Sequence, residues 1–240
     1  MQVEVCANSL QSAINAEKAG ADRIELCMEL GVGGVTPSYG LLKSVKEQVS
    51  IPVHVLVRPR SGDFTYSDSE FQIMRRNIKL CVDLGFDGVV SGILTENFEI
   101  DVARTAILIE DSKGINFTFH RAFDWVEDAK KALLQLEELK VDYILTSGQQ
   151  KTAVLGVVFL RELKNIAKHC VIMPGGGINA DNAKVFIEKS FMYVHLSGVE
   201  IKRREIFSTK ISMYSASFLK DNIIMETSFK AIKAMVSSVK

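Results

Sequence analysis

Apolar and polar residues alternate in short runs along the chain, and after most runs comes a longer segment with apolar residues every three or four positions. The short runs have the period of β-strands, and the longer segments have the period of amphipathic α-helices. We therefore predict eight strands, at Gln2–Cys6, Asp22–Leu26, Pro52–Val57, Asp87–Val90, Ile115–His120, Val141–Leu145, Cys170–Met173 and Met192–Leu196.

Helix signals lie between and after these strands. Asn8 or Ser9 is placed to cap a first helix that ends at Gly20, and Asp68 or Ser69 to cap a later one. Further helices are predicted around Leu41–Val45 and at about Val102–Asp111, Val126–Leu139, Leu155–Ala167, Ala180–Glu188 and, after a long polar loop, Asp221–Val239.

Eight strand–helix pairs in 240 residues match a (β/α)8 TIM barrel in number and in size. An open doubly wound sheet is the alternative, but no Gly-x-Gly-x-x-Gly follows the first strand. No linker or low-complexity run divides the chain, so we expect residues 1–240 to form a single TIM-barrel domain with all strand ends on one face.

Composition and charge exclude several classes of protein. Lys and Arg number 29, as do Asp and Glu, and this balance argues against nucleic acid as the main partner. No apolar run has the roughly 18–20 residues that a membrane helix needs. The chain enters a strand at Met1 and carries only four Cys, so we expect a cytoplasmic protein with free thiols. The sequence leaves both a monomer and a homo-oligomer open.

The polar members of the alternating strands indicate where the site lies. Helices cover the outside of a barrel, so the apolar side of each strand must face outward and the polar side inward or to the upper rim. The residues that this pattern brings together are Glu4, Cys6, Glu25, Cys27, His54, Arg58, His120, Arg121 and His195. For Glu4, a buried ion-pair network is the alternative to a functional role.

Two kinds of chemistry fit this set. Glu25, His54 and His120 are candidate proton-transfer groups. Residues suited to bind an anion form a second group: Arg58, Arg60, Arg121, Gly175, Gly176, Gly177 and Ser197. No nucleophile elbow, no His-Glu-x-x-His motif and no lysine at a strand end is present, which argues against serine hydrolase, zinc protease and Schiff-base aldolase chemistry.

Several long segments resemble signatures of the CutC family, the copper homeostasis proteins. They are Val3–Cys6, Ala19–Cys27, Gly33–Ser38, Ile51–Val53, Arg58–Asp68, Thr118–Asp124, Leu145–Gly148 and Met173–Ile178. The resemblance runs from about Met1 to Ser197, and departs from the family where Gly198 follows Ser197 and where Phe98 stands near an expected glycine. It implies a TIM barrel, a cytoplasmic location, and a role in copper tolerance with Cu(I) binding.

Two cysteines fit the copper interpretation. Cys6 and Cys27 end consecutive strands, and neighbouring strands lie about 4.8 Å apart. Thiolates select Cu(I) over harder metals, so this pair is the predicted Cu(I) site, although both residues also suit a buried apolar position.

We therefore predict a cytoplasmic copper homeostasis protein of the CutC type that binds Cu(I). The alternative is a TIM-barrel enzyme that acts by acid/base chemistry on a small anionic metabolite, phosphorylated or not. A third interpretation, a binding or chaperone module without catalysis, needs the same pocket but no tuned acid or base.

Overall fold

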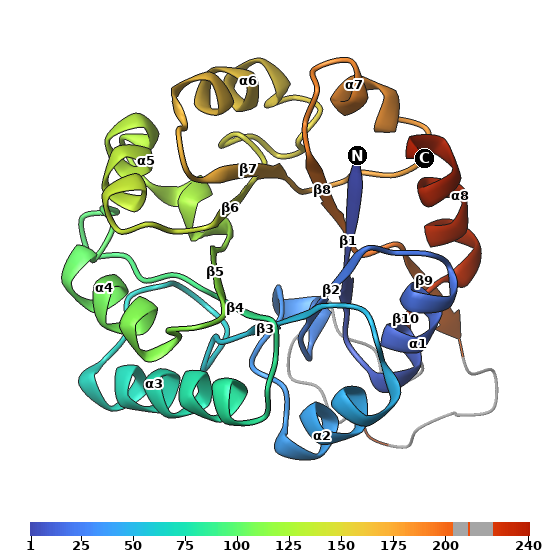
Figure 1. Ribbon diagram of the computed structural model, residues 1–240, viewed down its shortest axis with the longest axis horizontal. Helices are drawn as coiled ribbons and strands as arrows, with labels where there is room; N and C mark the ends of the chain where they lie inside the picture. Colours follow the sequence, from blue (N-terminus) through green and yellow to red (C-terminus); the bar gives the residue numbers. More distant parts are fainter. Residues whose placement is uncertain (204–210, 212–222) are drawn as a thin grey trace.

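Eight parallel strands form a ring at the centre of the computed structural model, and the long helices surround it (Figure 1). The structure describes residues 1–203, 211 and 223–240. The strands of the ring are β1 Gln2–Ala7, β2 Arg23–Leu26, β3 Val53–Leu56, β4 Gly88–Ser91, β5 Asn116–Phe119, β6 Tyr143–Thr146, β7 Val171–Pro174 and β8 Tyr193–Leu196. Each ends within one residue of the predicted position, so the predicted TIM barrel is confirmed.

The strand order β7-β6-β5-β4-β3-β2-β1-β8 makes β1 a neighbour of both β2 and β8. An isolated parallel bridge between Gly175 and His195 completes the ring between β7 and β8. The helices are α1 Leu10–Lys18, α2 Tyr39–Gln48, α3 Asp68–Asp83, α4 Val102–Asp111, α5 Ala129–Glu138, α6 Val157–Ile166, α7 Ala183–Ile187 and α8 Phe229–Val239, with short 3-10 helices η1 Leu30–Val32 and η2 Arg121–Trp125.

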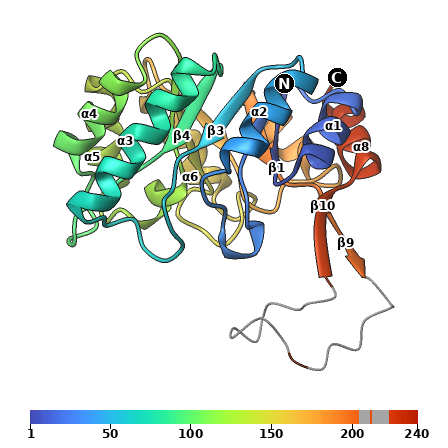
Figure 2. The same cartoon turned by 90° about the horizontal axis from the view of Figure 1, so that it is seen from below.

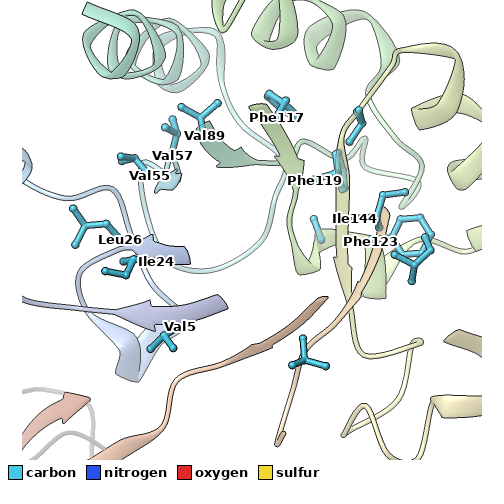
Figure 3. Packing of buried hydrophobic residues seen from close by; sticks show 14 of the residues in the cluster. Val5, Ile24, Leu26, Val55, Val57, Val89, Phe117, Phe119, Phe123 and Ile144 are labelled. Carbon is cyan, nitrogen blue, oxygen red and sulfur yellow. The ribbon is translucent and has the colours of Figure 1, made fainter. Parts of the chain in front are cut away.

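The main apolar core lies between the strands and the helices. Side chains such as Ile24, Val55, Val89 and Phe117 point outward from neighbouring strands, and all are fully or almost fully buried (Figure 3). Burying this alternating face against the helices drives assembly of the barrel. It also leaves the opposite faces of the strands, which carry the polar residues, turned toward the interior.

Helix α3 shows how local sequence sets one of these elements. Ser67 and Glu70 form a capping box at its N-terminus, in which each side chain bonds the backbone of the other residue. Phe71, Met74 and Ile78 are then buried at helical spacing, as the pattern predicts.

The C-terminal region differs from the prediction. The expected helix at Asp221–Val239 begins only at Phe229, and the preceding residues form β10 (Ile223–Thr227). This strand pairs antiparallel with β9 (Val199–Arg203) in a two-stranded ribbon that projects from the barrel (Figure 2). The Ile-Ile-Met-Glu-Thr run suits a strand, and Ser228 caps the helix that follows. Asp221 lies outside the described residues.

Two further boundaries are shorter than predicted. The helix expected at Ala180–Glu188 has only the five residues of α7, and β5 stops at Phe119, so that His120 caps η2 instead of ending the strand. Among the helices of the described part of the chain, none combines the length and apolar character needed to cross a membrane.

Candidate functional site

A cavity of about 510 Å³ opens at the carboxyl ends of the strands. Of the predicted site residues, it is lined by Cys6, Glu25, Arg58, His120, Arg121, Gly176, Gly177 and Ser197. His195, Asp124, Phe64 and Trp125 also line it. The volume falls in the range of about 300–1,000 Å³ that is usual for small-molecule sites.

The two predicted copper ligands lie together at the base of this region. The Sγ atoms of Cys6 and Cys27 are 3.4 Å apart, and both residues are buried. Parallel pairing of β1 with β2 sets Cys6 beside Glu25, two residues before Cys27. Cys6 lines the cavity and Cys27 lies behind it, so the thiol pair, Cys6 and Cys27, is reached from the cavity on the Cys6 side.

Glu25 and His195 extend the thiol pair into a group with metal-ligand character. Ligand atoms of Cys6, Glu25 and His195 all lie within 4.8 Å of one another, and the Cys6 thiol is 3.6 Å from Glu25 Oε1. The hydrogen bond to Cys27 and burial raise the pKa of the Cys6 thiol, so it is protonated in the metal-free protein. Burial also raises the pKa of Glu25.

Below this group lies a buried network of charged residues. His195 Nδ1 is 2.7 Å from Glu4 Oε1, and Arg23 Nε donates to Glu4 Oε2. Burial opposes ionisation of Glu4, but Arg23 and His195 outweigh it and lower its pKa to about 2. Burial likewise opposes protonation of His195, but the charge of Glu25 together with the hydrogen bonds to Cys6 and Glu4 outweighs it and raises the pKa. Glu4 therefore belongs to an ion-pair network, one of the two roles that the sequence leaves open.

His54 does not reach the cavity. It lies deeper in the barrel, with Nδ1 3.4 Å from Thr118 Oγ1, and it packs against Tyr143. A Cβ added to Gly88 would be 2.5 Å from its ring, so this glycine makes room for it. Burial and the charge of Arg23 lower the pKa of His54 to about 3.

Arg58 lines the cavity, but its guanidinium donates most of its hydrogen bonds to backbone carbonyls. Nη1 donates to the carbonyls of Val32 and Gly34 at 3.0 and 2.9 Å, and Nη2 donates to Gly62 at 2.7 Å. Within the described residues it forms no salt bridge and its Nε has no acceptor. Arg58 thus holds the glycine loop after β2 and leaves a buried positive charge beside the cavity.

Arg60 does not line the cavity. Its guanidinium pairs with Glu70 at 2.6 Å and with Asp63 at 3.0 Å, and it donates to the Thr65 carbonyl. The structure therefore places Arg60 in the loop before α3, apart from the other two arginines.

Arg121 lies at the rim, with its side chain 46 % exposed. Nε donates to Asp124 at 2.7 Å, and Nη2 donates to Ser147 Oγ at 3.0 Å. A Cβ added to Gly176, where φ is +113°, would be 3.6 Å from Nη1, so the guanidinium lies over the backbone after β7. Gly175 itself is absent from the wall, because it packs under Leu145 and His195 to close the barrel.

Sequence reasoning missed the role of Asp124. Its carboxylate accepts hydrogen bonds from Arg121, from the Ser147 amide and hydroxyl, and from the amide of Gln149. It thereby joins η2 to the loop after β6. Its position at the end of the Thr118–Asp124 segment is the signal that could have shown it.

A comparison with protein families matches residues 1–200 to the model described as the CutC family. The chain belongs to the CutC family. Its relatives include CutC family proteins of Proteus mirabilis (strain HI4320), 45 % identical over 82 % of this chain and 78 % of that protein, and of Pasteurella multocida (strain Pm70), 40 % identical over 100 % and 99 %.

Solved structures agree with this assignment. A structure of a copper homeostasis protein, CutC, from Streptococcus agalactiae matches with a TM-score of 0.77 and 35 % identity, over 81 % of this chain and 97 % of that chain. Thiamine phosphate pyrophosphorylase from Pyrococcus furiosus matches at 15 % identity with a TM-score of 0.61, covering 99 % of this chain and 95 % of that one, which shows a shared fold alone.

Proposed function

We propose that the protein binds Cu(I) through Cys6 and Cys27 and serves in copper handling in the cytoplasm. The observation that carries this proposal is the 3.4 Å separation of the two buried sulfurs. Metal–thiolate bonds are about 2.3 Å long, so both sulfurs at this spacing can contact one ion. Membership of the CutC family and the description of the Streptococcus relative support copper as the metal.

The residues around the sulfurs fit a soft monovalent ion. Cu(I) prefers thiolate to oxygen ligands, and Cys6 and Cys27 supply two. His195 and Glu25 lie close enough to add a third ligand or to hydrogen-bond a bound thiolate. A bound ion would replace the thiol protons. Leu56 and Val90 form a buried apolar cluster with the two cysteines and would shield the ion from water on the side away from the cavity.

The chain offers a matched control for a test. Cys6→Ser with Cys27→Ser removes the thiol pair, whereas Cys81→Ser with Cys170→Ser removes two other buried cysteines, on α3 and just before β7. Competition with a colorimetric Cu(I) chelator should show one tightly bound Cu(I) in the wild type and the control, and none in the first double variant. Unchanged stoichiometry and affinity in that variant would contradict the proposal.

A second candidate function is an enzyme that acts on a small anionic metabolite. Two atoms favour it: within the described residues, Glu25 Oε2 and His120 Nε2 are buried without a hydrogen-bond partner, although both residues line the cavity. Such groups are costly to leave unpaired, and a ligand in the cavity that bonds to them would remove this cost. In this proposal Glu25 is the acid/base group and Arg121 binds the anion, beside Gly176, Gly177 and Ser197.

Binding of inorganic phosphate and sulfate tests the anion part of this candidate. Arg121→Gln should weaken the thermal stabilisation produced by either ion, while Arg60→Gln, an arginine away from the cavity, should leave it unchanged. Equal loss in the two variants would indicate a general charge effect and would remove the basis of the anion site.

A further inference from the structure

The hydrogen bond that His120 accepts determines which of its ring nitrogens carries the proton. The backbone N–H of Ala122 donates to His120 Nδ1 at 3.2 Å, so Nδ1 is an acceptor and the ring proton is on Nε2. Burial and the charge of Arg58 lower the pKa of His120 to about 3, which keeps the ring neutral near pH 7. A neutral imidazole held in this way donates a hydrogen bond and does not act as an imidazolium acid.

The ring is held firmly in this orientation. It packs against Phe64 with a centroid distance of 4.9 Å, and a Cβ on Gly92 would come within 2.7 Å of Cε1 and Nδ1. With the Nδ1 edge occupied by Ala122 and Gly92, Nε2 is the ring nitrogen left for a ligand, and His120 is one of the residues that line the cavity. In the described part of the chain this Nε2, although buried, has no acceptor.

The charge next to His120 indicates what kind of acceptor fits. The Phe64 ring, which packs against His120, also contacts the guanidinium of Arg58, at 5.0 Å from its centroid. No described carboxylate lies within 4.0 Å of this guanidinium. An oxygen beside His120 is therefore in a positive field of low dielectric. Such a field favours an oxygen that only accepts and carries negative charge density, as a carbonyl does, over a hydroxyl.

Arg121 supplies a second contact for the same ligand. Its Nε and Nη2 are bonded to Asp124 and Ser147, whereas Nη1 donates to no described residue and lies over Gly176. A guanidinium fixed by two of its nitrogens is preorganised to bind a carboxylate or phosphate with the third.

We propose that the cavity binds a short-chain anionic carbonyl compound, with its carbonyl oxygen accepting from His120 Nε2–H and its carboxylate or phosphate on Arg121. This inference rests on the second candidate function and defines its substrate class. A hydrogen bond from a neutral N–H donor to the carbonyl oxygen stabilises the negative charge that develops there when a proton is removed from the adjacent carbon.

Two matched pairs of probes test the carbonyl. Dihydroxyacetone phosphate and pyruvate each carry a ketone, and glycerol 3-phosphate and lactate are the corresponding alcohols. The first pair has a phosphate as its anionic group and the second has a carboxylate, so the two pairs show which anion the site binds. Isothermal titration of the full-length protein should show the ketone of at least one pair binding about tenfold more tightly than its alcohol, because the alcohol leaves a buried donor poorly paired. His120→Phe, which keeps a flat ring without the donor, should abolish this preference, and His120→Gln, which restores an N–H, should recover part of it.

The outcomes separate the two levels of the proposal. If ketones and alcohols bind equally well and Arg121→Gln weakens both, the anion site stands and the carbonyl inference is overturned. If none of the four probes binds, both the inference and the second candidate function fail. Circular dichroism of the His120 variants checks that they are folded. Nitrogen-15 NMR of the wild-type histidines gives a check that needs no ligand: a proton on Nδ1 of His120, or on both nitrogens at pH 7, would also overturn the inference.

Discussion

Replacing Glu4 with Gln should reveal how much the charged interior of the barrel contributes to stability. Glu4 is fully buried and contacts both Arg23 and His195. The substitution keeps the size of the side chain and removes its charge. Two buried cations then lose a common counter-ion, which is the costly way to break a buried ion pair.

The magnitude follows from the pKa of Glu4, which is lowered from 4.5 to about 2. A difference of this size corresponds to about 3 kcal/mol of stability, in line with the roughly 3–5 kcal/mol lost when one partner of a buried pair is removed. Since the folded-state pKa is the lower one, this stabilisation is fully present above pH 4.5 and is lost as the pH falls toward 2. The deficit of Glu4→Gln should therefore be about 3 kcal/mol at pH 7 and should shrink below pH 4.5.

Urea unfolding followed by circular dichroism at pH 7, 4.5 and 3 measures this deficit. Glu47→Gln is the control, because Glu47 is 65 % exposed and, among the described residues, pairs only with Lys43 at 3.8 Å, so its loss should cost under about 0.5 kcal/mol. A deficit below about 1 kcal/mol at pH 7, or one that stays constant down to pH 3, would refute the argument.

Three further outcomes are expected. Cu(I) affinity, measured by chelator competition at pH 6, 7 and 8, should rise by about tenfold per pH unit for each displaced proton, because the Cys6 thiol, its pKa raised by the neighbouring thiol and by burial, is protonated in the free protein; a flat profile would contradict this. Gly92→Ala should lower the unfolding free energy by about 1–3 kcal/mol and shift the His120 ring resonances, since the added methyl meets the ring at 2.7 Å; unchanged spectra would show that the ring has room. Arg58→Met should accelerate amide hydrogen exchange in the loop around Gly34, whose carbonyl accepts from Arg58, and wild-type exchange rates would be evidence against that anchoring role.

The fold was predictable because each strand carries its own signal. Ile24, Val55 and Phe117 face the helices and their neighbours in sequence face inward, so a period of two was enough to place every strand end within one residue. The ribbon at the C-terminus was not predictable in this way. Local propensity in Ile223–Thr227 competes with the helix beyond it, and pairing with Val199–Arg203, far away in sequence, decides the outcome.

The sequence predicted which side chains point into the barrel, but not how far each lies from the cavity. Alternation turns His54 and His120 inward alike, but His54 is the second residue of β3 and lies below the cavity, whereas His120 follows the last residue of β5 and lines it. Arg60 lies beyond the end of its strand, where the strand period no longer applies and contacts with Asp63 and Glu70 decide its direction. Alternation alone contains none of this information.

The position of β1 between β2 and β8 has a consequence for synthesis of the chain. Cys6 and Cys27 lie in or directly after the first two strands of the ring to be synthesised, whereas His195, which lies beside Cys6, comes with the last strand of the ring. At about 5–20 residues per second, the two thiols wait on the order of ten to thirty seconds before the ring can close around them. During that interval they are part of an open, incomplete sheet, in which the two thiols are accessible to soft metal ions and to oxidants without the protection of the finished cavity.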